Sequence, residues 1–283
     1  METGAALVAH QNGLKRMGAR PPLGEYISEA WARRDFAYAI SAFTNEAANA
    51  RNALGKWWSI LLPTLQAATY GLIFGFILGN RRPDNFLAFM FTGVFLFQFL
   101  SGSLSSGAKS IATNSGLLKS LSFPRILLPL SAVIRQFLNL LPQLAVLAVA
   151  LLLLQRTISW SWFAMVPILM LMVIFGLGVA FFAARLTVHL EDLSKVIPFI
   201  NRILFYASGI FFSFDKLAAD IPWLESVRFL NPIYDFVELA RGALVVGYSM
   251  TFELWISCLI WAIAVFVPAV IYFWLAEERY GED

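Results

Sequence analysis

Charged side chains are scarce in this sequence. Asp, Glu, Lys and Arg make up 14% of the 283 residues, while hydrophobic residues make up 59%. A soluble domain of this length has no use for so much apolar surface, so the composition excludes an ordinary soluble protein and predicts an integral membrane protein. The net charge of +3 does not indicate nucleic-acid binding, because basic residues that gather on one side of a membrane explain it.

Residues that carry enzyme chemistry are also few. The single cysteine, Cys258, excludes an intramolecular disulfide, and the two histidines, His10 and His189, are isolated from each other. The nearest approach to a phosphate-binding loop lies in residues 102–110, but Ala108 spoils its spacing and an apolar run precedes it instead of a strand. The sequence therefore predicts no metal site, no cofactor bound by this chain and no hydrolytic activity of its own.

Six long apolar runs organise the chain. Each is long enough to cross a bilayer, and the first begins near Trp57, too late for a cleaved signal peptide. Pro198 is expected to break the fifth run. We predict an all-α integral membrane protein with six transmembrane helices, at residues 57–80, 85–108, 126–154, 157–184, 196–214 and 254–276.

Glycines repeat every four residues in the first run, at Gly71, Gly75 and Gly79. Such a stripe lets two helix backbones approach closely in lipid. The stripe serves either packing within one chain or a contact between two copies, and the sequence leaves both open.

Two segments outside the runs have patterns of their own. Residues 1–34 form a polar tail with a helix expected near 25–34, and residues 35–56 form an amphipathic helix. Phe36, Ile40 and Phe43 share its apolar face, which predicts a helix that lies at the membrane surface or packs on other protein.

The region between the last two runs, residues 215–253, is too polar to cross the membrane and too apolar for a free loop. Short re-entrant helices are expected there, since broken backbone is tolerated at membrane depth where protein buries it. Residues 278–283 form a short tail.

The distribution of basic residues predicts the orientation. With the N-terminus in the cytoplasm, thirteen of the 21 Lys and Arg residues fall on the inner side and six on the outer side, with Arg135 and Arg202 inside runs. This bias favours a multi-pass protein of the plasma (inner) membrane with both termini in the cytoplasm.

The segment between the second and third runs, residues 114–129, contains basic residues, a glycine and two prolines where a short turn would suffice. A short amphipathic helix over 114–122, ended by Phe123-Pro124, fits the pattern, with the next helix starting near Arg125. An ordinary basic loop and a surface that a partner pushes are both compatible with it. The candidate contact residues are Asn114, Leu117, Leu118, Lys119, Leu121, Phe123, Pro124 and Arg125.

Two further sets of side chains are candidates for substrate contact. Arg135 and Arg202 either extend to the membrane interface or, with Arg51 and Lys56, attract an anionic head group such as a diphosphate. Aromatic rings crowd two runs and face either lipid or a lumen for sugar; the candidates are Phe95, Phe97, Phe99, Tyr206, Phe211 and Phe212.

With these motifs in place, the chain resembles ABC-2 type membrane subunits of bacterial ABC exporters, above all those for O-antigen, teichoic acid and related polysaccharides. Residues 54–57 with Pro63 match the entry to the first span, residues 114–125 match the coupling helix, and Asn231, Pro232 and Arg241 match the outer re-entrant region. The polar tail and Ala-rich composition are similar to actinobacterial members that export cell-wall galactan.

The resemblance implies a homodimer of this subunit with two copies of an ATP-binding cassette subunit, which carries ATP and Mg²⁺. It implies that the 114–122 helix receives the push of the ATPase, and that the substrate is a glycan linked to a polyprenyl diphosphate. Two other functions remain in view: export of a small hydrophobic compound, and a membrane enzyme that acts on polyprenyl lipids. Such an enzyme needs clustered acidic or histidine residues at one membrane face, and the pair Glu191 and Asp192 is the only inner-face candidate.

Overall fold

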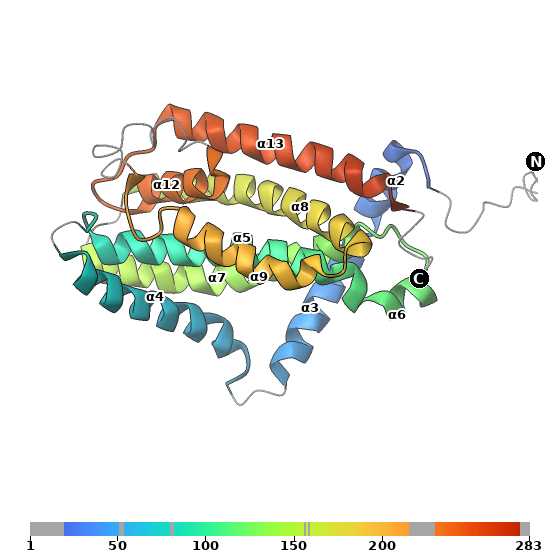
Figure 1. The fold of residues 1–283 in the computed structure, drawn as a ribbon, viewed down its shortest axis with the longest axis horizontal. Helices are drawn as coiled ribbons and strands as arrows, with labels where there is room; N and C mark the ends of the chain where they lie inside the picture. Colours follow the sequence, from blue (N-terminus) through green and yellow to red (C-terminus); the bar gives the residue numbers. More distant parts are fainter. Residues whose placement is uncertain are drawn as a thin grey trace, which may run out of the picture.

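The structure is a computed structural model that describes residues 20–50, 54–79, 82–155, 157, 159–214 and 230–277. The described chain folds into a bundle of helices whose long axes run roughly side by side (Figure 1). In chain order they are α2 (Leu23–Ala32), α3 (Arg34–Ala50), η1 (Gly55–Trp57), α4 (Trp58–Ile77), α5 (Phe86–Thr113), α6 (Ser115–Ser120), α7 (Leu127–Gln155), η3 (Trp160–Ala164), α8 (Met165–His189), α9 (Leu193–Ala207), α12 (Pro232–Leu244) and α13 (Phe252–Trp274).

Five of these helical segments are long and apolar enough to cross a membrane: Trp58–Ile77, Phe86–Thr113, Leu127–Gln155, Trp160–His189 and Phe252–Trp274. They correspond to five of the six predicted runs. The second extends past the predicted end at residue 108 to Thr113, and the fourth extends past residue 184 to His189. Both extensions are helical turns beyond the apolar run, which hydropathy alone does not detect.

The predicted fifth span, residues 196–214, is not one continuous helix. Helix α9 starts earlier, at Leu193, and continues through Pro198, so the expected break at that proline is wrong. It ends at Ala207, where Gly209 takes a positive φ of 61° and turns the chain. With 15 residues, α9 rises about 22 Å, which is less than the hydrocarbon thickness of about 30 Å.

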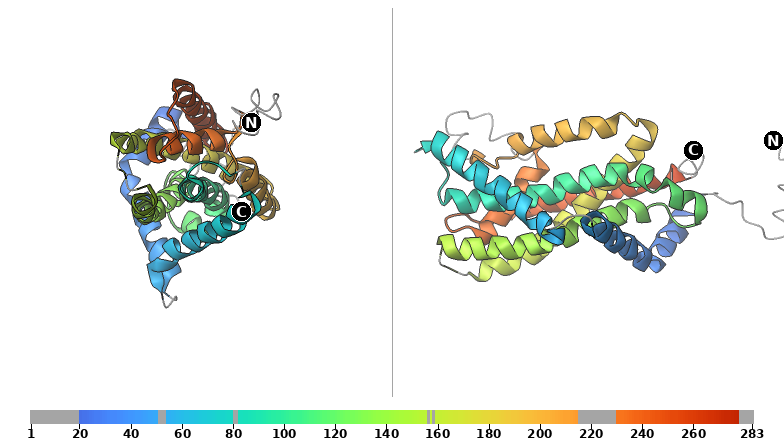
Figure 2. Two further views of the ribbon diagram at one scale, coloured as in Figure 1. Left: turned by 90° about the vertical axis from the view of Figure 1, so that its left-hand side faces the viewer. Right: turned by 90° about the horizontal axis from the view of Figure 1, so that it is seen from below.

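Helix α5 lies at the centre of the bundle, with α7 and α8 against it and α13 on the far side of α8 (Figure 2). Close approach of α5 and α8 depends on Gly107, where an added Cβ would lie 2.5 Å from the Cβ of Ala180. Helix α8 meets α13 in the same way, because a Cβ on Gly178 would lie 2.8 Å from the backbone of Phe266. Glycines thus bring three helices into backbone contact.

The glycine stripe on α4 packs within the chain at two of its three positions. A Cβ on Gly71 would meet Leu87 at 3.0 Å and Met90 at 3.1 Å, both on α5. Gly75 faces Phe86 at 3.7 Å. Gly79 lies beyond the end of α4 at Ile77 and has a positive φ of 50°, so the expectation that it continues the helical stripe is wrong.

The two ends of the bundle differ (Figure 1). One end, here called the α6 end, carries α2, α6, the 190–192 connection and residue 277. The other, the α12 end, carries α12, η3 and the connection from α4 to α5. The helix expected near residues 25–34 is α2, and it lies against the end of α13 through a hydrogen bond of 2.8 Å from Trp274 Nε1 to the Pro21 carbonyl.

Candidate functional site

The short helix expected between the second and third runs is α6, which projects from the α6 end of the bundle (Figure 1). None of its six residues is buried. Asn114 ends α5 and donates from Nδ2 to the Ser110 carbonyl at 2.7 Å. Leu118 packs partly against an apolar cluster at this end, while Lys119 and Leu121 are exposed. Helix α6 therefore presents a surface with both charge and apolar area.

The segment after α6, residues 121–126, is not helical and is held by the N-terminal helices; residues 121–124 have no regular structure and residues 125–126 form a turn. Arg33 donates to the Ser122 carbonyl at 2.8 Å, and the rings of Phe36 and Phe123 meet edge to face with centroids 5.0 Å apart. Pro124 is buried, and α7 begins at Leu127, two residues after the predicted restart at Arg125.

A carboxylate from the end of the chain binds the same segment. Glu277 Oε1 accepts from the backbone N–H of Arg125 at 3.0 Å, and Oε2 accepts from the Tyr26 hydroxyl at 2.7 Å. The Tyr26 oxygen in turn accepts from the backbone N–H of Ile126 at 3.1 Å, and the Arg125 guanidinium donates to the Glu277 carbonyl. We call these four residues the clamp. Sequence reasoning missed Tyr26 and Glu277, because only the fold brings the two ends of the chain together.

Burial defines the chemistry of the clamp. Glu277 is 7% exposed and Tyr26 1% exposed. Burial raises the pKa of the Glu277 carboxyl above its ordinary value, and the hydrogen bonds from Arg125 and Tyr26 partly offset that rise.

Arg135 lies in a pocket at the junction of α3, α5 and α7, with a volume of about 420 Å³. Its Nη2 donates to the Ser106 hydroxyl at 3.2 Å, and that hydroxyl also accepts from Gln136 at 2.8 Å. A guanidinium has five N–H donors, so donors remain for a ligand. The pocket is lined by Ile40, Phe43, Thr44, Ala47, Ser106, Ser110, Thr113, Asn114, Leu128, Ser131, Ala132 and Arg135. Its lining combines one cation with hydroxyl side chains, but the hydroxyls of Thr44, Ser110, Thr113 and Ser131 already donate to backbone carbonyls. The guanidinium is therefore the group in this pocket that is suited to an anion.

Of the other predicted head-group residues, the structure places only the side chain of Arg202 relative to this pocket. Arg202 is exposed on α9 and does not line it. Arg51 lies outside the described residues, as does the side chain of Lys56, whose backbone is in η1. Helix α3 contributes Phe43 and Thr44 to the pocket and packs on α7 through the buried Ala37 and Ser41.

The predicted channel aromatics lie mostly inside the chain. Phe95, Phe97, Phe99 and Phe211 are buried, Phe212 is half-buried, and Tyr206 is 49% exposed. Phe97 and Phe211 belong to a cluster that joins α4, α5 and α9, with centroid distances of 5.0 Å from Phe97 to Phe205 and 4.1 Å from Phe74 to Phe211. Tyr70, Phe74 and Phe205 were missed from sequence, although the spacing of four residues between Tyr70 and Phe74 puts both on one face of α4.

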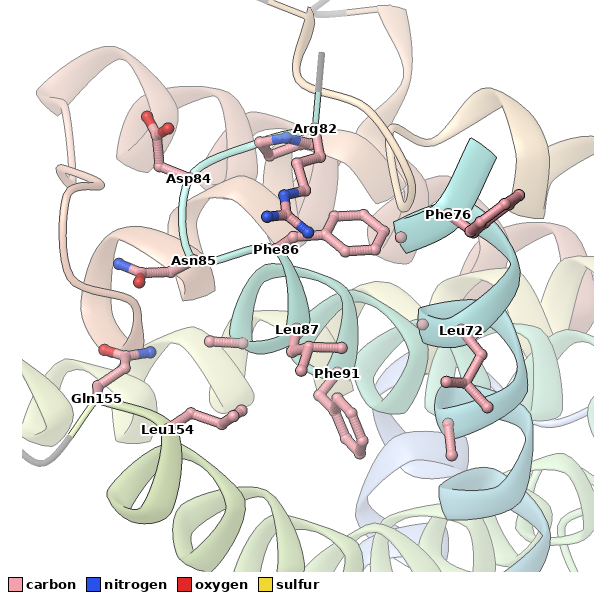
Figure 3. A pocket seen from close by; sticks show the side chains of 15 residues that line it. Leu72, Phe76, Arg82, Asp84, Asn85, Phe86, Leu87, Phe91, Leu154 and Gln155 are labelled. Carbon is pink, nitrogen blue, oxygen red and sulfur yellow. The ribbon is translucent and has the colours of Figure 1, made fainter. Parts of the chain in front are cut away.

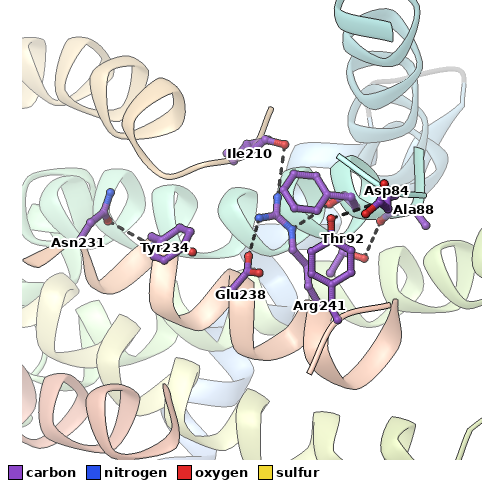
Figure 4. Close-up of polar contacts among 10 residues, drawn as sticks. Asp84, Ala88, Thr92, Ile210, Asn231, Tyr234, Glu238 and Arg241 are labelled. Carbon is purple, nitrogen blue, oxygen red and sulfur yellow. Dashed lines mark hydrogen bonds and ion pairs between the residues drawn. The ribbon is translucent and has the colours of Figure 1, made fainter. Parts of the chain in front are cut away.

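Asn231 and Pro232, the predicted re-entrant residues, build the start of α12 (Figure 4). The Asn231 side chain caps the helix by accepting from the N–H groups of Ile233 at 3.1 Å and Tyr234 at 3.3 Å, and Pro232 occupies the first turn. The side-chain amide nitrogen of Asn231 donates to the Ala207 carbonyl at 3.1 Å. One side chain thus joins α12 to the end of α9.

Arg241 joins α12 to the centre of the bundle (Figure 4). It is fully buried and donates to Glu238 at 3.1 Å, to the Phe89 carbonyl at 3.2 Å and to the Ile210 carbonyl at 3.3 Å. Its guanidinium also lies over the Phe89 ring, 3.2 Å from the centroid. These partners satisfy its charge within the protein, which defines a structural role for Arg241.

A second, larger cleft of about 1160 Å³ opens near the α12 end between α4 and α5 and includes the last residues of α7 (Figure 3). Its lining is mainly apolar and includes Leu72, Leu87 and Phe91, with Phe76 at the outer edge and the polar residues Arg82 and Asp84 where the chain enters α5. It differs from the Arg135 pocket in having a wide apolar surface.

The carboxylates considered for a membrane enzyme do not form a reactive group. Asp192 pairs with Lys195 at 2.7 Å, and both side chains are exposed. Among the described residues there is no group of three or more His, Cys, Asp or Glu residues placed to hold a metal ion. The geometry thus supports a multi-pass, all-helical membrane protein whose polar sites are suited to binding and movement.

The sequence profile of the ABC-2 type transporter family matches residues 42–245, which is most of the chain. The chain belongs to that family, as a membrane permease subunit; in this family the ATPase is a separate protein.

Individual relatives agree with the family. The chain is 30% identical over 185 residues to an O-antigen export system permease protein RfbA of Klebsiella pneumoniae, covering 65% of this chain and 70% of that protein. It is 26% identical over 159 residues to the protein of the same name from Myxococcus xanthus, covering 56% and 61% of the two chains. The polysialic acid transport protein KpsM of Escherichia coli is 26% identical over 210 residues, covering 69% and 75%.

Proposed function

We propose that this chain is the membrane subunit of an ATP-driven exporter that moves a polysaccharide, linked to a polyprenyl diphosphate, from the cytoplasm to the outer face of the plasma membrane. The observation that carries the proposal is the family match together with relatives named for O-antigen and polysialic acid. The resemblance to galactan exporters identified from sequence names one possible glycan class.

The proposed assembly contains two copies of this subunit and two ATP-binding cassette subunits that bind ATP and Mg²⁺. Helix α6 is the coupling helix, so the α6 end faces the cytoplasm together with both termini. Its exposed Lys119 and Leu121, with half-buried Leu117 and Leu118, supply the contact surface. The excess of Lys and Arg in the segments assigned to the inner side supports this orientation.

The proposed topology has six passages. Helix α9 is too short to cross the bilayer alone, so we propose that residues 208–214 complete the fifth passage toward the α12 end. Residues 230–253, with α12 buried among other helices, form the described part of the proposed re-entrant region; residues 215–229 lie outside the described residues.

The Arg135 pocket is the proposed site for the diphosphate, because its guanidinium is suited to an anion and lies beside helix α3. Arg51 and Lys56 are proposed to add positive charge where the chain enters α4, and Arg202 to act from α9. Tyr206, exposed at the edge of the aromatic cluster, is the proposed contact for sugar rings that pass between the two subunits, while Phe97 and Phe211 support it from within.

A substrate comparison tests the proposal. The subunit and its ATP-binding partner are reconstituted in lipid, and ATP hydrolysis is measured with a polyprenyl-diphosphate oligosaccharide or with a lipophilic drug. We expect the oligosaccharide to stimulate hydrolysis. Stimulation by the drug alone would instead favour export of a small hydrophobic compound. The wide apolar cleft in Figure 3 is consistent with that function.

Replacing Arg135 with Gln is expected to weaken substrate-stimulated ATP hydrolysis and spare the basal rate. A hydrogen bond to a charged group contributes about 1.5–3 kcal/mol, so the half-stimulating concentration of the oligosaccharide should rise about tenfold or more. Arg202→Gln, made in parallel, measures how much an exposed arginine outside the pocket contributes to the half-stimulating concentration of the oligosaccharide. An equal loss of basal and stimulated rates in Arg135→Gln contradicts the head-group role.

A further inference from the structure

The clamp joins three parts of the chain that are far apart in sequence. Tyr26 comes from α2, Arg125 and Ile126 from the segment that follows α6, and Glu277 from the turn after α13. The segment 121–126 is the only covalent path from α6 to α7, so whatever holds it decides how a displacement of α6 reaches the bundle.

The hydrogen bonds of the clamp are arranged in series. The Tyr26 hydroxyl donates to Glu277 and accepts from Ile126, while the second carboxylate oxygen of Glu277 accepts from Arg125. One buried hydroxyl and one buried carboxylate therefore fix two consecutive backbone N–H groups just before α7 begins. Buried and charge-assisted, such bonds are stiffer and more selective than a surface contact.

Additional contacts anchor α2 and α3 around the clamp. Trp274 donates to the Pro21 carbonyl, and the Arg20 guanidinium lies over the Trp274 ring, 4.3 Å from its centroid. On the other side, Arg33 holds the Ser122 carbonyl. The N-terminal region thus contacts both the segment after α6 and the end of α13. Through these contacts and the clamp, the start of α7 and the end of α13 are connected to each other.

We propose that Tyr26 and Glu277 are positioning residues of the ATPase-coupled movement: they hold segment 121–126 rigidly, so that a push on α6 moves α7 and the end of α13 together. The proposal rests on the proposed function, in which α6 receives that push. Without the clamp, this non-helical segment would absorb the displacement, and ATP would be hydrolysed with less transport.

The test uses the full chain with its ATP-binding partner in proteoliposomes and a polyprenyl-diphosphate oligosaccharide as the probe. Tyr26→Phe removes the hydroxyl and both of its bonds, and Glu277→Gln leaves one oxygen where two are needed as acceptors. For each variant, transport per ATP hydrolysed is measured per assembled complex. We expect this ratio to fall about fivefold or more, the factor equivalent to the net contribution of about 1 kcal/mol that a typical hydrogen bond makes.

A double variant separates a shared role from two independent ones. If Tyr26 and Glu277 act through one contact, the combined substitutions lower the ratio by about as much as either alone. Tyr38→Phe, an exposed tyrosine on α3, is the matched control and should leave the ratio unchanged. The proposal is overturned if the Tyr26→Phe and Glu277→Gln variants transport less only because less complex assembles, while transport per ATP hydrolysed equals that of the wild type.

The outcome is distinguishable from failure of the proposed function. A Lys119→Glu, Leu121→Asp variant examines α6 alone, because both side chains are exposed. If that variant transports normally, α6 is not the coupling helix and the proposed function fails. If it stops transport while Tyr26→Phe and Glu277→Gln keep the normal ratio, only the role of the clamp is refuted.

Discussion

Transport is expected to stop when α6 carries Leu118→Asp together with Lys119→Glu, while the chain still inserts and folds. The reason is that α6 contributes no buried residue to the bundle, so its surface is available to a partner. Reversing the charge at Lys119 and placing a carboxylate at Leu118 removes both the electrostatic and the apolar part of a contact with the ATPase. Loss of transport by at least a factor of ten is the expected result.

The structure refines this experiment. Leu118 packs partly against the apolar cluster at the α6 end, so Leu118→Asp also weakens the bundle. Leu121 is 51% exposed, and the Lys119→Glu, Leu121→Asp variant therefore separates partner contact from folding. Transport and copurification of the ATP-binding subunit are measured together, with thermal stability of the purified chain as the folding control. Wild-type transport in this variant contradicts the assignment of α6.

Long apolar runs in the sequence correctly predicted the helices that contain them. The spans at 58–77, 86–113, 127–155, 160–189 and 252–274 each follow such a run. The fifth passage was harder, because α9 is short and ends where Gly209 adopts a positive φ, which no hydropathy pattern reveals. The expected break at Pro198 is wrong, because a proline at the sixth residue of α9 removes one backbone hydrogen bond without ending the helix.

The candidate site was predicted in part for the same reason. Residues 114–125 are local in sequence, so their helix and proline break were recognisable. Arg135 was recognised as a charge inside an apolar run, whereas its pocket with Ser106 required the packing of α5 on α7. Tyr26 and Glu277 carry no local signal at all, because their partners lie far away along the chain.

Glycine provides a second case. The glycine repeat of the first run predicted close approach of helix backbones. An added Cβ at Gly75 nevertheless meets Phe86 only at an ordinary distance of 3.7 Å. The approaches of one helix to the backbone of another instead depend on Gly107 and Gly178, which lie outside that repeat. Spacing identifies a smooth helix face, but only the facing backbone decides which glycine is indispensable.

Gly107→Ala is therefore expected to destabilise the bundle strongly. The new methyl carbon would lie 2.5 Å from the Cβ and 2.6 Å from the Cα of Ala180, and neither atom belongs to a flexible side chain. Helices α5 and α8 must move apart to accommodate it, which disrupts the packing of the central helix. Overpacking typically costs about 1–3 kcal/mol, and contact with backbone places this site at the upper end of that range.

The measurement is the thermal unfolding of the purified chain in detergent, with Gly75→Ala as the matched control in α4. The control adds the same methyl group to a helix where the nearest atom is 3.7 Å away, so its stability should change little. We expect Gly107→Ala to lower the apparent melting temperature by about 4–10 °C, as follows from about 2–4 °C per kcal/mol for chains of this size. Equal melting temperatures for the two variants would mean that α5 and α8 do not approach as closely as Gly107 and Ala180 indicate.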